Sequence, residues 1–171
     1  ELDRSAAAIG FGEVVMLGYR DSGMPDSPDN ADPRCFARAP EDEAIGRLVA
    51  VIRRTRPHVI LTYGDEQTGY PHPDHLRVHD ISIIAWEAAG DPGRFPDAGE
   101  PWTPSKLYYS TRARARFTAL HEAFLANELE SPFDQKWFDR PSLDHRITTQ
   151  IDITGYYSVR SAALRAHATQ I

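Results

Sequence analysis

Three histidines and one aspartate gather in a short stretch of the sequence with the spacing of a single helix face. His72, His75 and His79 are separated by three and then four residues, so on a helix that begins near Pro73 their side chains share one face. Asp74 lies between the first two. Imidazole and carboxylate groups are common metal ligands and proton carriers. This stretch is therefore a candidate metal or acid–base site.

The same residues also have an ordinary structural interpretation. His72 could cap the helix and Asp74 could complement its dipole, with the other histidines exposed. On spacing alone the two interpretations are about equally good. Tyr70 precedes the cluster, and prolines at 71 and 73 stiffen it, which favours the rigid placement that a preorganised site requires. A catalytic zinc site needs about three protein ligands, and this stretch does not fix all three.

Two apolar runs rich in β-branched residues predict buried strands at residues 14–17 and 58–63. Between them, residues 41–54 carry apolar side chains at helical spacing, with acidic residues in the first turn and arginines in the last, which indicates an amphipathic helix. A second helix is expected from about Pro73 to Gly90, because proline is favourable at the first helical position. This order predicts a βαβ unit with parallel strands.

The polar loops of this unit are expected to face one ligand cleft. Residues 19–40 and 64–72 follow the two predicted strands, and ligands of parallel sheets bind at the carboxyl ends of the strands. Further elements are expected elsewhere: a helix at 1–10, a strand at 106–110, a helix at 114–130, a strand at 147–153 and a helix at 155–167. We therefore expect one α/β domain over residues 1–171, with a Rossmann-like, mostly parallel sheet and flanking helices.

The composition narrows the classes of function. Hydrophobic residues make up 41% of the chain and charged residues 26%, the balance of a globular protein, and no apolar run approaches the roughly 20 residues that cross a bilayer. The formal net charge of −6 argues against nucleic acid as a partner, since a phosphate-binding surface needs clustered positive charge. Cys35 is the only cysteine, which excludes an internal disulfide and favours a cytoplasmic location. The oligomeric state is not indicated.

At residues 69–75 the sequence resembles a known family. Gly-Tyr-Pro-His-Pro-Asp-His, preceded by Arg-Pro-His-Val at 56–59 and Thr-Tyr at 62–63, is similar to the second motif of the LmbE-like, PIG-L type zinc deacetylases. Asp-Ser-Gly-Met at 21–24 and Arg-Ala-His-Ala-Thr-Gln-Ile at 165–171 resemble motifs of the mycothiol branch of that family. The resemblance spans nearly the whole chain.

The resemblance implies a role for individual residues. It implies that His75 binds zinc, with iron(II) as the other candidate metal. His72 would be a catalytic histidine that stabilises the oxyanion or protonates the leaving amine, and Asp74 would orient it. Tyr70 would help to hold the tetrahedral intermediate. Substrate-binding positions are implied as well: Asp21 for sugar or inositol hydroxyls, and Gln170 for the rim of the pocket.

The implied activity is hydrolysis of an amide next to a glucosamine–inositol unit. The implied substrate that contains this unit is a small-molecule thiol conjugate. Residues 95–102 and 105–109 are most similar to members that cleave mycothiol S-conjugates into glucosaminyl-inositol and an N-acetylcysteine conjugate, a detoxification reaction. Deacetylation of inosityl N-acetylglucosamine is the alternative, and a non-catalytic sugar-binding relative is another. The family's His-Pro-Asp-Asp motif, which provides two zinc ligands and the general base, does not occur in this sequence. We therefore expect the chain to be part of a larger hydrolase domain, with those groups upstream of Glu1.

Overall fold

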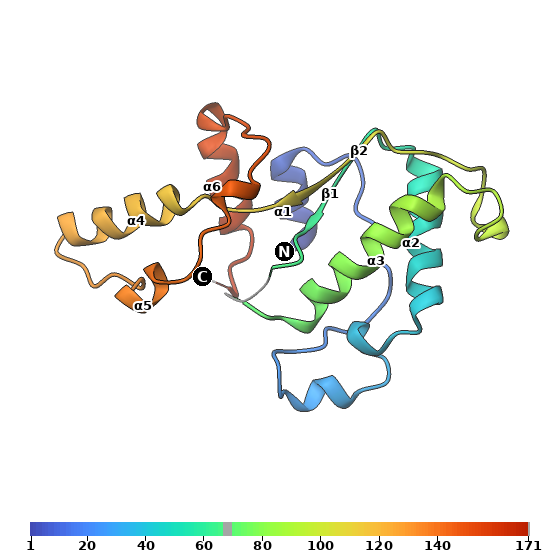
Figure 1. Ribbon diagram of the computed structural model, residues 1–171, viewed down its shortest axis with the longest axis horizontal. Coiled ribbons are helices and arrows are strands. Elements are labelled where there is room, and N and C mark those ends of the chain that lie inside the picture. The colour runs from blue at the N-terminus through green and yellow to red at the C-terminus, as the bar shows by residue number, and fades with distance from the viewer. Residues whose placement is uncertain (67–69, 171) are drawn as a thin grey trace. The chain divides into compact units, whose positions relative to one another are not determined.

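The computed structural model describes residues 1–66 and 70–170, which form two compact units (Figure 1). The sheet unit is Glu13–Ser110, and the terminal unit combines Glu1–Gly12 with Thr111–Ile171. Gly69 and Ile171, which belong to two of the family-like motifs, lie outside the described residues. The single domain expected over the whole chain stays a prediction. None of the helices in the described part is long and apolar enough to cross a membrane.

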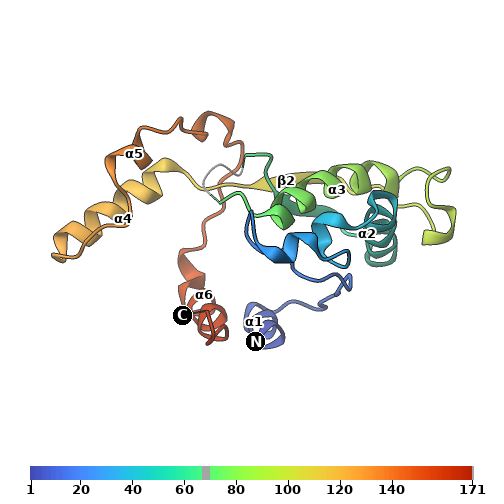
Figure 2. The same ribbon diagram turned by 90° about the horizontal axis from the view of Figure 1, so that it is seen from below.

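The sheet unit confirms the α/β fold class. Strand β1 (Val59–Tyr63) pairs in parallel with β2 (Lys106–Ser110), with Val59 opposite Lys106 and Tyr63 opposite Ser110. Parallel strands cannot be joined by a tight turn and need a crossover, which helix α3 (Pro73–Ala89) provides. Helix α3 packs against β1 and against α2 (Glu41–Thr55). Figures 1 and 2 both show α2 and α3 side by side.

The hydrophobic core of the sheet unit lies between these two helices. Ile45, Val49 and Ile52 of α2, predicted from their helical spacing, are buried together with Ile81 and Ala85 of α3. Each large aliphatic side chain buried in this way contributes about 1.5–3 kcal/mol. The core therefore holds α3 firmly, and its first turn, which carries the histidine cluster, has a fixed place.

A buried arginine holds the irregular segment that follows α3. Arg53 on α2 is 3% exposed. Backbone carbonyl oxygens, and not a carboxylate, stabilise its positive charge. The guanidinium donates hydrogen bonds to six backbone carbonyls: those of Ala88, Ala89, Asp91, Arg94, Phe95 and Gly99. Carbonyls at a helix C-terminus carry the negative end of the helix dipole, which explains why a cation is stable there.

Two predicted strands do not form. Residues 14–17 have no ladder partner in the described parts of the chain, and Met16 is 73% exposed. Neighbouring strands pair at about 4.8 Å. Here a cavity of about 700 Å³ has the segment from Met16 to Asp21 on one side and β1 on another, so these two segments are too far apart to pair along it. Residues 147–153 form no strand either, because the described part of their unit contains no strand with which they could pair.

All the regular secondary structure in the described residues of the terminal unit is helical. Helix α1 (Leu2–Ile9) packs against α6 (Tyr157–Arg165). Helix α1 ends at Gly10, as predicted, with a φ of 91°, a left-handed conformation that costs glycine little. Helix α4 (Arg114–Ala126) is shorter than predicted, and α5 (Gln135–Phe138) forms in a stretch expected to be a loop. Short 3-10 turns complete the chain: Pro28–Ala31, Phe36–Arg38, Pro96–Ala98, Asp144–Arg146 and Thr154–Tyr156.

Candidate functional site

The candidate site is built on the first turn of α3. Pro73 is the first helical residue, as predicted, and His72 is the N-cap. The Nδ1 atom of His72 accepts a hydrogen bond of 3.1 Å from the backbone N–H of Asp74. His72 is 8% exposed. It therefore has the capping role that the structural interpretation of the sequence expected, and its ring is held in one orientation.

This cap decides which ring nitrogen of His72 carries the proton. A backbone N–H can only donate, so Nδ1 must hold a lone pair, and the proton of the neutral ring lies on Nε2. Nε2 is 3.8 Å from Oδ1 of Asp21, whose side chain is 76% exposed. The neutral ring therefore presents an N–H donor on the exposed side of the cluster. Such a fixed donor can stabilise a developing oxyanion.

His75 lies beside His72 in a group of aromatic rings. The ring of Tyr63, at the end of β1, stacks on His75 with centroids 4.1 Å apart and planes at 13°. The rings of Tyr70 and His72 lie 5.2 Å and 5.3 Å from that of His75. Burial lowers the pKa of His75, and the nearby His72 lowers it further. His75 is therefore neutral near neutral pH, which is the form of imidazole that binds metals.

The predicted loop of residues 19–40 is attached to α3 through Ser22. The backbone N–H of Ser22 donates to Oδ2 of Asp74 at 3.1 Å, and its hydroxyl donates to Oδ1. The carboxylate of Asp74 thus binds Ser22. Asp74 contacts the ring of His72 through its backbone N–H, which makes the hydrogen bond of the cap. Asp21 accepts a hydrogen bond from the backbone N–H of Gly23 at 2.7 Å.

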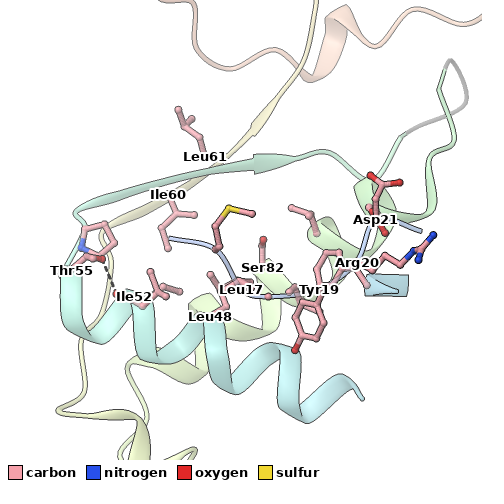
Figure 3. A pocket seen from close by; sticks show the side chains of 18 of the residues that line it. Leu17, Tyr19, Arg20, Asp21, Leu48, Ile52, Thr55, Ile60, Leu61 and Ser82 are labelled. Carbon is pink, nitrogen blue, oxygen red and sulfur yellow. Dashed lines mark hydrogen bonds between the residues drawn. The ribbon is translucent and has the colours of Figure 1, made fainter. Parts of the chain in front are cut away.

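Asp21 and Asp74 lie at the polar end of the cavity of about 700 Å³. Figure 3 shows Asp21 near the carboxyl end of β1, with apolar side chains such as Ile60 and Leu48 along the rest of the cavity. Carboxylates accept hydrogen bonds, so this end of the cavity can bind hydroxyl groups of a ligand. The cavity itself runs along residues 59–61 of β1, and only its end at Asp21 lies near the carboxyl end of the strand, where the βαβ pattern predicted a ligand cleft.

Three of the predicted site residues could in principle hold a cation together. Ligand atoms of Asp21, His72 and Asp74 lie within 4.8 Å of one another. Two of these groups are already engaged, however, because Ser22 binds both oxygens of Asp74 and the cap uses Nδ1 of His72. Ligation by Nε2 of His72 would move its proton to Nδ1 and break the cap. Among residues 1–66 and 70–170, the ring of His75 makes no hydrogen bond that ligation would break.

Comparison with known proteins places the chain in a family. The model of the PIG-L family, described as GlcNAc-PI de-N-acetylase, matches residues 1–86, which include both Asp21 and His75. The chain belongs to the PIG-L family. This PIG-L chain is also similar over its whole length to curated bacterial proteins. They carry two kinds of name, deacetylase and amidase.

Three relatives represent the two kinds of name. The 1D-myo-inositol 2-acetamido-2-deoxy-alpha-D-glucopyranoside deacetylase 1 of Frankia alni is 39% identical, with the match covering 100% of this chain and 62% of the relative. The mycothiol S-conjugate amidase of Streptomyces coelicolor is 40% identical, with 100% and 60% covered. A deacetylase of the first kind from Streptomyces scabiei is 42% identical, with 100% and 56% covered. The PIG-L chain thus spans about 60% of the length of these relatives.

The structure of the PIG-L chain brings five of the six predicted site residues into one unit. Tyr70 is 53% exposed and its ring lies 6.0 Å from that of His72. Gln170 belongs to the terminal unit, so its place at the rim of the pocket stays a prediction. Sequence reasoning gave no role to Ser22 or Tyr63. Ser22 follows Asp21 directly, and Tyr63 ends a predicted strand. The sequence alone does not show that Ser22 binds Asp74 or that Tyr63 stacks on His75.

Proposed function

We propose that this chain carries part of the active site of a metal-dependent hydrolase that cleaves an amide next to a glucosamine–inositol unit. The observation that carries the proposal is the first turn of α3, where the fixed N–H donor of His72 lies beside the neutral ring of His75 and faces Asp21. Membership of the PIG-L family and the names of the relatives support the same class of reaction.

The metal is assigned to His75. Its lowered pKa keeps the ring neutral, and it avoids the conflict between ligation and capping that applies to His72. Zinc is the proposed ion and iron(II) the alternative, and further ligands would come from a segment outside this chain that carries the His-Pro-Asp-Asp motif. A bound zinc ion lowers the pKa of its water ligand and polarises the amide carbonyl.

The side chains of this chain have distinct proposed tasks. His72 donates its Nε2–H to the oxygen that becomes negative in the tetrahedral intermediate. Oxyanion stabilisation suits the neutral, capped ring better than protonation of the leaving amine, which would require a second ring proton. Asp21 accepts hydrogen bonds from sugar or inositol hydroxyls, and Tyr70 supports the intermediate from the exposed side of His72.

Mycothiol S-conjugates are the proposed substrates. The support comes from the sequence of residues 95–102 and 105–109, which is most similar to the members that cleave these conjugates. In the structure this segment packs on the core through Phe95 and Trp102. Among the described contacts, it does not touch Asp21 or His72. Deacetylation of inosityl N-acetylglucosamine is the second candidate, because several relatives bear that name.

Hydrolysis rates of the full-length protein on the two substrates separate these candidates. We expect a higher kcat/KM for the S-conjugate, measured by release of glucosaminyl-inositol. Faster release of acetate from the N-acetyl substrate would reverse the assignment. Protein that binds no stoichiometric metal and hydrolyses neither substrate after zinc or iron(II) is added would instead indicate a non-catalytic sugar-binding protein.

A further inference from the structure

We propose that Ser22 is a positioning residue for substrate binding. It fastens the loop of residues 19–40 to the first turn of α3 and thereby sets the carboxylate of Asp21 opposite His72. The inference rests on the proposed function, because it concerns the residue that would bind the sugar or inositol hydroxyls.

Ser22 is the centre of a closed set of hydrogen bonds. It is 0% exposed. Its hydroxyl oxygen accepts the backbone N–H of Ala37 at 2.9 Å, and its carbonyl accepts the side-chain amide of Asn30. Its own N–H and O–H both donate to the carboxylate of Asp74. One buried side chain therefore joins the beginning of the loop, its end and the helix.

The direction of these bonds is fixed by their chemistry. The hydroxyl of Ser22 has one proton, and since the N–H of Ala37 can only donate, the proton is left for Asp74. A hydrogen bond to a carboxylate is charge-assisted and stronger than one between neutral groups. An alanine at this position would leave an oxygen of Asp74 and the N–H of Ala37 without this partner in a partly buried place. The chain would have to move to restore them.

Asp21 would follow that movement. It is the residue before Ser22, and the hydrogen bond of its carboxylate to Gly23 lies within the same loop. That bond fixes the local conformation of Asp21 but does not fix its position relative to α3. The 3.8 Å between Oδ1 of Asp21 and Nε2 of His72 is set by where Ser22 is fastened. Ser22 thus acts on the substrate through Asp21.

The test compares Ser22→Ala with Ser27→Ala in the full-length protein. Ser27 is a matched control, because it lies in the same loop and its hydroxyl accepts a backbone N–H from Asp29 at 3.3 Å, without a described hydrogen bond to α3. We expect Ser22→Ala to raise KM roughly 10-fold, the effect of about one charge-assisted hydrogen bond, with kcat and metal content almost unchanged. Ser27→Ala should leave KM within about twofold.

A double-variant cycle separates positioning from a general loss of structure. If Ser22 acts through Asp21, Ser22→Ala should add little to the rise in KM that Asp21→Asn causes alone. Additive effects, or an unchanged KM in Ser22→Ala, overturn the proposal. If Ser22→Ala does not fold, Ser22→Cys provides the same comparison, since the thiol is only a weak donor.

Hydrogen exchange reports on the fastening without any substrate. Amides of residues 22–37 should exchange faster in Ser22→Ala than in the wild type, and Ser27→Ala should not reproduce this change across the loop. Unchanged exchange in Ser22→Ala overturns the structural part of the inference. A wild-type protein that hydrolyses neither substrate refutes the proposed function by itself, whereas an active wild type with unchanged KM in Ser22→Ala refutes only the role of Ser22.

Discussion

Substituting His72 by asparagine should separate the two tasks that the structure gives this residue. His72→Asn keeps a side-chain oxygen that can accept the N–H of Asp74, and asparagine is among the best N-cap residues. It removes the ring and with it the Nε2–H donor. His72→Ala removes both the cap and the donor. The pair of variants therefore shares the loss of the proposed catalytic group and differs in the cap.

The expected magnitudes follow from the bonds involved. The cap of α3 is one hydrogen bond of 3.1 Å, and loss of such a cap costs about 1 kcal/mol. For a chain of this size that corresponds to a fall in the unfolding midpoint of about 2–4 °C, expected for His72→Ala and not for His72→Asn. Loss of an oxyanion donor lowers kcat by about 10²–10³, which is expected for both variants.

Thermal unfolding and steady-state hydrolysis by the full-length protein provide the two readouts. Equal loss of stability in the two variants would show that the cap does not stabilise α3. Nearly wild-type turnover in His72→Asn would refute the assignment of the Nε2–H as a catalytic donor, whatever the stability result.

Three further predictions concern the framework and the ionisation of the site. Arg53→Met should lower the free energy of unfolding by on the order of 3 kcal/mol, because buried carbonyls lose their donor, whereas Arg54→Met, which removes an exposed ion pair, should change the unfolding midpoint little; similar losses in both would contradict the role of burial. In metal-free protein, NMR titration of His75 should give a pKa below the usual value of about 6.5, since burial disfavours its charged form. Protonation of this ring therefore destabilises the fold as pH falls. A raised pKa would contradict the burial of the neutral ring in the site. Gly23→Ala should destabilise the loop, because φ there is 71° and the added carbon would lie 2.7 Å from the hydroxyl oxygen of Ser27; unchanged exchange of the loop amides would count against this.

Local patterns in the sequence were enough to predict the elements that carry the site. The helix expected at residues 41–54 is Glu41–Thr55, and the one expected from Pro73 to about Gly90 is Pro73–Ala89. Helical periodicity, proline at the first helical position and glycine after the last are all short-range signals. β1 and β2 were also predicted, because each is a short run of residues with high strand propensity.

Interactions between distant residues could not be read in the same way. Residues 14–17 and 147–153 have the composition of strands, but a strand forms only where a neighbour completes its hydrogen bonds. The bond between Ser22 and Asp74 joins positions 52 residues apart, and no periodicity encodes it. The site residues themselves were predicted by residue type and family resemblance, whereas the tautomer of His72 required the geometry of the cap.

The metal content of purified full-length variants tests the central claim most directly. His75 is proposed to bind the metal, and His72 is proposed to act as a neutral donor that does not. Elemental analysis should therefore find about one metal ion per site in the wild type and in His72→Asn, and almost none in His75→Ala. Loss of metal in His72→Asn, or retention of it in His75→Ala, would contradict the account.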